Sequence, residues 1–208
     1  MVSRLFGIVR SGLRETSMSS MLESLGYLAV LLAAAADGVI PIVPGESTVI
    51  AASVLASSGH LSLWIVILMG ALGATIGDSA AYWIGAAGQG RVKQRIVRSL
   101  GEKRIAAAED LLRRRGWMLI VFGRFVPGLR TLTSVSSGIL GYPYRRFLPI
   151  SMLAGALWAT YAGLLGFFVG EAVGNVWISL GVAIVVSVAI SFVLVLLERP
   201  RLRGLLKG

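Results

Sequence analysis

One apolar stretch, Gly116–Gly141 (GWMLIVFGRFVPGLRTLTSVSSGILG), restricts the folds open to this chain more than any other part of it. The stretch contains two arginines, Arg124 and Arg130, and no acidic residue. A charged side chain at the centre of a bilayer costs about 3 kcal/mol on insertion scales, so this stretch is a poor membrane-spanning helix. Pro127 also removes a backbone donor and disfavours helical backbone at Val126.

A backbone that breaks at membrane depth survives only where protein buries it or where it lines a wet cavity. We therefore predict that residues 117–141 form a re-entrant hairpin, which enters the membrane and returns to the same side. Its two arginines are expected to face the protein interior, because lipid cannot solvate them.

The composition of the whole chain indicates a polytopic membrane protein. Of its 208 residues 56% are hydrophobic and 14% are charged, and the mean hydropathy is +0.81. These values are too apolar for an ordinary soluble domain. The chain has no cysteine and a single histidine, His60, which excludes disulfides and multi-histidine metal centres. We expect no cofactor.

The net charge of +10 is concentrated in clusters that flank the apolar segments. Eighteen of the 20 basic residues lie in four such clusters: Arg4–Arg14, Arg91–Arg115, Arg145–Arg146 and Arg199–Lys207. The cytoplasmic loops of membrane proteins show this pattern, and their basic side chains contact anionic headgroups. We prefer this interpretation to nucleic-acid binding.

A second break in the chain falls between Asp37 and Glu46, where two prolines and two glycines interrupt any helix. The apolar segments on either side, Met21–Ala36 and Ser47–Ser58, are both shorter than the roughly 20 residues that a spanning helix needs. We therefore predict a second re-entrant hairpin at residues 37–58.

The fold class expected is an all-α polytopic membrane protein, in which two opposed re-entrant hairpins pack among spanning helices. The predicted spanning helices are Leu61–Ala87, Phe147–Val169 and Val176–Leu197. The basic segment Gly90–Arg115 is expected to be a cytoplasmic helical loop. Residues 1–20 are interpreted as a cytoplasmic interfacial lead-in, residues 21–198 as the membrane domain, and residues 199–208 as a basic cytoplasmic tail.

The positive-inside rule places the N-terminus, the basic loop Gly90–Arg115 and the tail inside, and His60 outside. If Met21–Ala36 crosses outward, the two broken segments enter from opposite faces and meet near the midplane. Inverted-repeat transporters have this design, with the central site at the breaks. Here only hydropathy and the placement of the breaks relate the two halves.

Five ionisable residues are predicted to lie within the membrane: Asp37, Glu46, Asp78, Arg124 and Arg130. The two acids and two arginines of the hairpins sum to zero charge, so they can pair if the hairpins meet. Intramembrane ionisable residues usually mark a pathway or relay, and arginine binds phosphate with a planar fork. We predict that the arginines bind an anionic headgroup while an acid exchanges a proton. Ion pairs that only stabilise the fold are the alternative.

Asp78 lies apart from the hairpins. It either forms a hydrogen bond between helices or takes part in the site, and the sequence leaves both roles open. Its helix has a face of small residues at spacings of three and four: Gly70, Gly73 and Gly77. This face fits internal packing and a dimer equally well. Three tryptophans are interpreted as interfacial anchors: Trp64, Trp158 and Trp177.

From about Asp37 to Gly170 the chain resembles the DedA family of bacterial membrane proteins, also called the SNARE-associated or VTT domain. Three motifs carry the resemblance: Asp37-x3-Pro41-x2-Pro44-Gly45-Glu46, Gly73-x3-Gly77-Asp78-x3-Tyr82-x2-Gly85, and Gly123-Arg124-Phe125-x-Pro127-Gly128-x-Arg130. Phe147 and Trp158 also fall where that family places aromatic residues.

The resemblance implies opposed re-entrant hairpins in the inner membrane and transport that depends on the proton-motive force. It implies a polyisoprenyl phosphate carrier (undecaprenyl phosphate) or phospholipids as the cargo. The functional acids of the family correspond to Asp37, where glutamate is usual, and to Glu46. Its paired arginines correspond to Arg124 and Arg130. An aspartate at position 37 keeps the carboxylate but shortens its reach.

We therefore predict a transporter, and not an enzyme, that flips an anionic lipid phosphate across the cytoplasmic membrane. Its expected partners are that lipid, the surrounding membrane lipids and protons, with a homo-oligomer left open. The alternatives are a general phosphatidylethanolamine flippase or scramblase, a small-ion antiporter, and a non-transporting membrane-homeostasis factor. A lipid phosphatase is disfavoured, because such enzymes typically need a histidine near their arginines and His60 is predicted on the opposite face.

Overall fold

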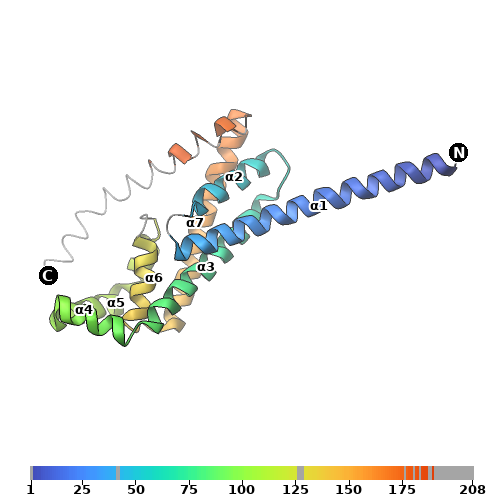
Figure 1. Ribbon diagram of the computed structural model, residues 1–208. Coiled ribbons are helices and arrows are strands. Elements are labelled where there is room, and N and C mark those ends of the chain that lie inside the picture. Colours follow the sequence, from blue (N-terminus) through green and yellow to red (C-terminus); the bar gives the residue numbers. More distant parts are fainter. Residues whose placement is uncertain are drawn as a thin grey trace.

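The computed structural model describes residues 2–40, 43–125, 129–175, 177–179, 181–182, 184–186 and 189, and in these ranges it is helical without a strand. Its elements, labelled in Figure 1, are α1 (Val2–Val39), α2 (Gly45–Ser57), α3 (Leu63–Ala87), α4 (Arg91–Leu100), α5 (Glu102–Gly123), α6 (Leu129–Ile139) and α7 (Tyr144–Val173). The predicted all-α class is confirmed.

Three helices are long and apolar enough to cross a membrane: Ser20–Val39 within α1, all of α3, and all of α7. The predicted spanning helices Leu61–Ala87 and Phe147–Val169 are therefore present as helices, the second one longer than expected. The predicted span Val176–Leu197 lies mostly outside the described residues, and the basic tail lies wholly outside them.

Helices α3 and α7 form an antiparallel pair at the centre of the structure. Gly155 of α7 lies opposite Ala71 and Thr75, whereas Gly163, two turns later, lies opposite Ile67 and Leu63. A Cβ atom at Gly163 would be 2.7 Å from Cγ1 of Ile67. Small residues at this crossing let the two helices approach closely, as is usual for helices in membranes.

Helix α1 packs beside α3 but reaches only midway along it. Near the start of α3, the Ser62 N–H donates to the Tyr27 hydroxyl at 2.7 Å. At the other end of the contact, Gly38 lies against the backbone of Gly77. The chain then turns and α2 runs back, until Ser57 lies against Gly170 at the end of α7. Helix α1 therefore ends beside the middle of α3. Its apolar part, Ser20–Val39, is long enough to cross a membrane, and the predicted outward crossing by Met21–Ala36 stays a prediction.

The first break falls later in the sequence than predicted. Asp37 lies in the last turn of α1, which continues to Val39, and not in a separate hairpin segment. No proline precedes Pro41, whose ring disfavours helical backbone only from Ile40 onward. Residues 2–20 of the predicted lead-in belong to the same helix as the apolar segment that follows them.

Helix α6 packs against the second half of α3, the part that α1 does not reach. It begins at Leu129, after the break, and Gly138 near its end lies against the backbone of Tyr82 and Ala86 in α3. Because α2 ends beside Gly170 and α6 ends beside Ala86, the two short helices run from the middle of the structure toward opposite ends. Figure 1 shows them on different ends of the α3–α7 pair.

The basic segment Gly90–Arg115 is helical, as predicted, and consists of α4 and the first part of α5. Non-helical backbone at Arg115 bends α5, so that its apolar last turns lead toward the second break. The break itself, at Val126, Pro127 and Gly128, lies outside the described residues.

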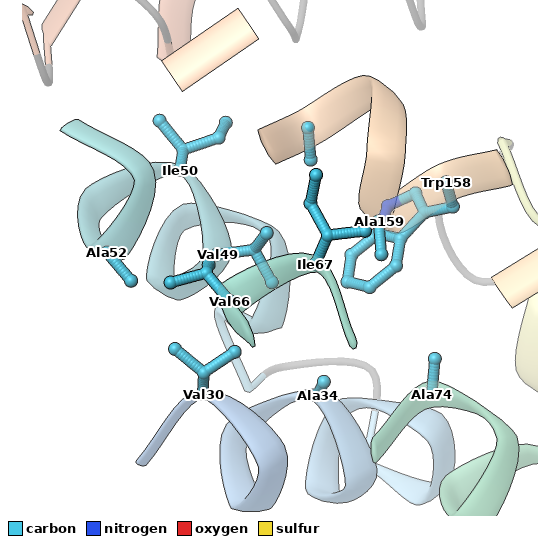
Figure 2. Close-up of a cluster of buried hydrophobic side chains, with 11 residues drawn as sticks. Val30, Ala34, Val49, Ile50, Ala52, Val66, Ile67, Ala74, Trp158 and Ala159 are labelled. Atoms are coloured by element: carbon cyan, nitrogen blue, oxygen red, sulfur yellow. The ribbon is translucent and has the colours of Figure 1, made fainter. Parts of the chain in front are cut away.

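Two hydrophobic cores fill the two halves of the structure. The first, drawn in Figure 2, joins α1, α2, the first half of α3 and the middle of α7, and includes Val30, Ile50, Val66 and Trp158. The second joins the end of α3, α5 and the start of α7, and consists of Tyr82, Leu112, Ile120, Tyr142 and Phe147. The Tyr82 hydroxyl donates to the Tyr142 carbonyl, which ties α3 to the segment before α7.

The glycine face of α3 serves internal packing. Gly73 lies against Leu31 and Ala34 of α1, Gly77 lies against Ala35 and Gly38 of α1, and Gly70 lies against Val49 and Ala159. The open choice between internal packing and a dimer is therefore decided in favour of packing within the chain.

We predict that Gly138→Ala lowers the thermal stability of the protein. A Cβ atom at position 138 would collide with the Tyr82 carbonyl, so α6 must move away from α3. Overpacking of this kind costs about 1–3 kcal/mol. The measurement is a thermal melt in detergent followed by tryptophan fluorescence. Gly90→Ala is the control, since a Cβ there meets nothing within 4 Å; equal melting temperatures for the two variants would contradict the packing described.

Candidate functional site

A buried carboxylate, Asp78, lies between the two cores. On α3 it follows Ala74 of the first core by one turn and precedes Tyr82 of the second core by one turn. Its side chain is 2% exposed. The position fixes its surroundings, because every neighbouring element must supply partners for a charge that water does not reach.

Arg124, at the end of α5, is the principal partner of Asp78. Its Nη1 atom donates to Oδ2 of Asp78 at 2.5 Å, and the same oxygen accepts a hydrogen bond from the Ser151 hydroxyl at 2.8 Å. The Arg124 side chain is 1% exposed. Its guanidinium carbon lies 5.1 Å from the ring centroid of Trp158, within the range of a cation–π contact. Helices α3, α5 and α7 thus meet at one buried ion pair.

A second ion pair joins the two breaks of the chain. Nη1 of Arg130, in the first turn of α6, lies 3.1 Å from Oδ2 of Asp37 in the last turn of α1. Nε of Arg130 is also 3.9 Å from Oδ1 of Asp78, which is too long for a hydrogen bond. The Thr131 hydroxyl donates to the Gly38 carbonyl at 3.2 Å, so α6 is held to the end of α1 twice.

The two ion pairs differ in how far water reaches them. The side chains of Arg130 and Asp37 are 10% and 18% exposed, against 1% and 2% for Arg124 and Asp78. An ion pair can open only if water solvates the two separated charges for a time, or if another ion takes the place of one partner. The Arg130–Asp37 pair is therefore the one that a ligand or a proton reaches more easily.

Several buried polar atoms of this cluster have no hydrogen-bond partner among the described residues. They are Nε and Nη2 of Arg124, Nη2 of Arg130 and Oδ1 of Asp78. A buried donor without a partner costs roughly 1–3 kcal/mol, and more when it is charged. Three donor nitrogens from two guanidinium planes are the donor set that a phosphate or carboxylate would satisfy.

The short helices add to the positive potential at the cluster. Helix α6 begins one residue before Arg130, and helix α2 begins at Gly45, where a Cβ atom would lie 2.7 Å from Oδ2 of Asp37. Both helices therefore direct their N-termini, which carry a partial positive charge, at this region. The glycine at position 45 is required by the close approach to Asp37.

Four of the five predicted intramembrane charges come together in this cluster. The structure assigns the central role to Asp78, which the sequence left apart from the hairpins, and Asp37 and Asp78 are the carboxylates whose ion pairs with the arginines define the site. Glu46 lies in the first turn of α2 and is half-buried. Its predicted pairing with an arginine stays a prediction.

The family model of the VTT domain matches residues 43–168, more than half of the chain. The chain belongs to the VTT-domain (DedA) family. All three predicted motifs have most of their residues within the matched range, and the match includes Asp78, Arg124 and Arg130.

Several curated relatives of this VTT-domain protein are named as membrane proteins. An uncharacterized membrane protein of Mycobacterium tuberculosis, Rv2637, is 31% identical over 85% of this chain and 88% of its own length. Inner membrane protein YohD of Escherichia coli is 26% identical over 82% of this chain and 91% of its own. The uncharacterized membrane protein slr0232 of Synechocystis is 29% identical over 76% of this chain and 73% of its own. No solved structure matches the chain significantly.

Sequence reasoning missed two residues of the site, Ser151 and Trp158. Trp158 was predicted to be an interfacial anchor, but it is 4% exposed and lies over Arg124, so that prediction is wrong. The spacing could have shown this, because Phe147, Ser151 and Trp158 fall on one face of a helix at i, i+4 and i+11. Trp64 and Trp177, by contrast, are 75% and 82% exposed.

We predict that Asp78→Asn destabilises this protein strongly, by about 3–5 kcal/mol, because it leaves the Arg124 guanidinium buried without a counter-charge. The double variant Asp78→Leu/Arg124→Met should recover much of the loss, since no unpaired charge remains. Thermal melts of the purified protein in detergent provide the measurement.

Asp110→Asn is the matched control, since Asp110 pairs with Arg114 on the exposed surface of α5 and should leave the melt unchanged. If Asp78→Asn melts like Asp110→Asn, the buried pair does not organise the fold.

Proposed function

We propose that this VTT-domain protein transports an anionic lipid phosphate across the cytoplasmic membrane, with undecaprenyl phosphate as the leading candidate. The observation that carries the proposal is the set of buried N–H groups of Arg124 and Arg130 that have no partner among the described residues. Two guanidinium planes at membrane depth, with two helix N-termini directed at them, fit a phosphate headgroup.

The arrangement of the helices supports a transport pathway that is open from either side in turn. If α3 and α7 cross the membrane, α1 with α2 forms a hairpin from one face, and the end of α5 with α6 forms a hairpin from the other. The units α1–α2–α3 and α5–α6–α7 then correspond as an inverted repeat, with the charged cluster where the two hairpins meet. Two opposed re-entrant hairpins related as an inverted repeat are the arrangement predicted from the sequence.

This arrangement changes the topology inferred from the sequence. Helix α1 meets α3 at the start of α3, where Tyr27 contacts Ser62, whereas α4 follows the other end of α3. In this arrangement the N-terminal basic cluster and the basic segment Gly90–Arg115 lie on opposite faces of the membrane, so only one of them faces the cytoplasm. The segment Gly90–Arg115 holds nine basic and three acidic residues, and the positive-inside rule assigns it to the cytoplasmic face. The N-terminal lead-in would then lie on the outer face.

Coupling to protons follows from charge balance. Arg124 and Arg130 with Asp37 and Asp78 sum to zero, so an added phosphate brings an uncompensated negative charge into a region of low dielectric. Protonation of one aspartate would restore neutrality and release its arginine to the phosphate. Asp37 is the better candidate, because its side chain is the most exposed of the four.

A general phospholipid flippase is the second candidate, because phosphatidylethanolamine also carries a phosphate that two arginines can bind. Competition separates the two. Excess phosphatidylethanolamine would slow the movement of labelled polyprenyl phosphate if the site does not distinguish the lipids, and would leave it unchanged if the site is specific.

We predict that Arg130→Gln abolishes lipid-phosphate movement and that Arg130→Lys retains only a small part of it. Lysine keeps the charge but not the planar fork. The assay is protection of labelled polyprenyl phosphate in liposomes that contain the reconstituted protein. Arg114→Gln, at an exposed arginine, is the control and should transport normally. Equal rates for the wild type and Arg130→Gln would refute the proposal.

We predict that Asp37→Asn removes the response of transport to a pH gradient. Asparagine cannot exchange a proton, so movement down the lipid gradient should persist while acceleration by an imposed gradient is lost. Ser47→Ala, in the nearby first turn of α2, is the control for local disturbance. Full acceleration in the Asp37→Asn variant would exclude Asp37 as the proton-exchanging group.

A further inference from the structure

Helix α4 is a basic amphipathic element that the proposed transport site does not use. Three arginines, Arg91, Arg95 and Arg98, follow one another at spacings of four and three, so they share one face. All three are exposed, and α4 contains no acidic residue. This face therefore has no negative partner on its own helix.

The other side of α4 is apolar and only partly covered. Val92 is 42% exposed, and Ile96, one turn later on the same side, is half-buried. Neither residue belongs to the two hydrophobic cores. A strip of this kind is unfavourable in water, so it requires a partner that is also apolar.

The helix has a fixed place relative to the rest of the protein. It begins four residues after Ala87, the last residue of the spanning helix α3. The salt bridge between Lys93 and Glu109, with Nζ 2.7 Å from Oε1, ties α4 to α5. The exposed rings of Trp83 and Trp117 lie near this end, one on α3 and one on α5, where interfacial tryptophans are common.

We infer that α4 lies in the plane of the membrane surface and binds anionic phospholipid headgroups. Val92 and Ile96 enter the boundary between headgroups and acyl chains, and the arginines reach the phosphates around them. Arg145 and Arg146, both exposed in the first turn of α7, add basic side chains at the same end of α3, where Tyr144 contacts Trp83. The ligand class is a negatively charged lipid surface, and the inference does not depend on the lipid that the central site transports.

The absence of cysteine from the chain allows a direct test. A single cysteine at Val92 or, as the control, at Gln94 on the polar side of α4 carries an environment-sensitive NBD fluorophore. Each labelled protein is reconstituted into liposomes of phosphatidylcholine alone, or of two parts phosphatidylcholine to one part phosphatidylglycerol.

The probe at position 92 should shift to the blue in the anionic liposomes, whereas the probe at position 94 should stay water-like in both. High salt should reverse the shift, because it screens the arginines. Replacement of Arg91, Arg95 and Arg98 by glutamine should remove it, since each basic residue near an anionic surface changes the docking equilibrium about fivefold. A thermal melt checks that the triple variant is folded.

Three outcomes would overturn the inference. A water-like probe at position 92 in every liposome would show that the apolar strip does not enter the bilayer. An equal blue shift without phosphatidylglycerol would remove the role of the anionic headgroups. A shift that depends on protein density and not on lipid charge would identify a second copy of the chain as the partner.

Discussion

The Asp78–Arg124 ion pair is the interaction on which the rest of this structure depends. It lies where water does not reach, between two hydrophobic cores, and it joins the middle of α3 to the end of α5. Neither charge is tolerable there alone, because the desolvation cost exceeds what any single neutral partner returns. Ser151 and Trp158 complete the surroundings from α7. Three helices are thus held in register by electrostatics as well as by packing.

Glycines let the helices approach closely enough for these buried charges to pair. Gly77 precedes Asp78 and lets the end of α1 approach the α3 backbone, which brings Asp37 within reach of Arg130. Gly138 does the same for α6 against α3. Close helix contacts and buried charges are therefore parts of one arrangement, because the short aspartate side chains can meet the arginines only if the backbones are near. The two pairs differ in exposure: the Asp78–Arg124 pair is buried, and the Asp37–Arg130 pair is partly exposed.

Much of this architecture was predictable from residue types and their order. Two arginines in an apolar stretch beside Pro127 predicted a broken segment, and the helices on either side of that break, α5 and α6, are present. The apolar length of Leu61–Ala87 predicted α3 to within two residues at its start. The C-terminal end of the first helix was less well predicted: it was expected at Ala36, and the helix ends at Val39. A helix without an internal proline continues until packing or a later proline stops it.

The sequence by itself determined that the chain is helical, that it belongs in a membrane, and that five charged side chains must be hidden from lipid. These conclusions follow from local composition and the cost of burying charge, which do not depend on the fold. Only the tertiary structure decided which charges pair, since Asp78 and Arg124 are 46 residues apart and no local rule relates them. It also decided that α1 stops midway along α3 and that Trp158 covers a guanidinium, because both depend on how the backbones of distant helices cross.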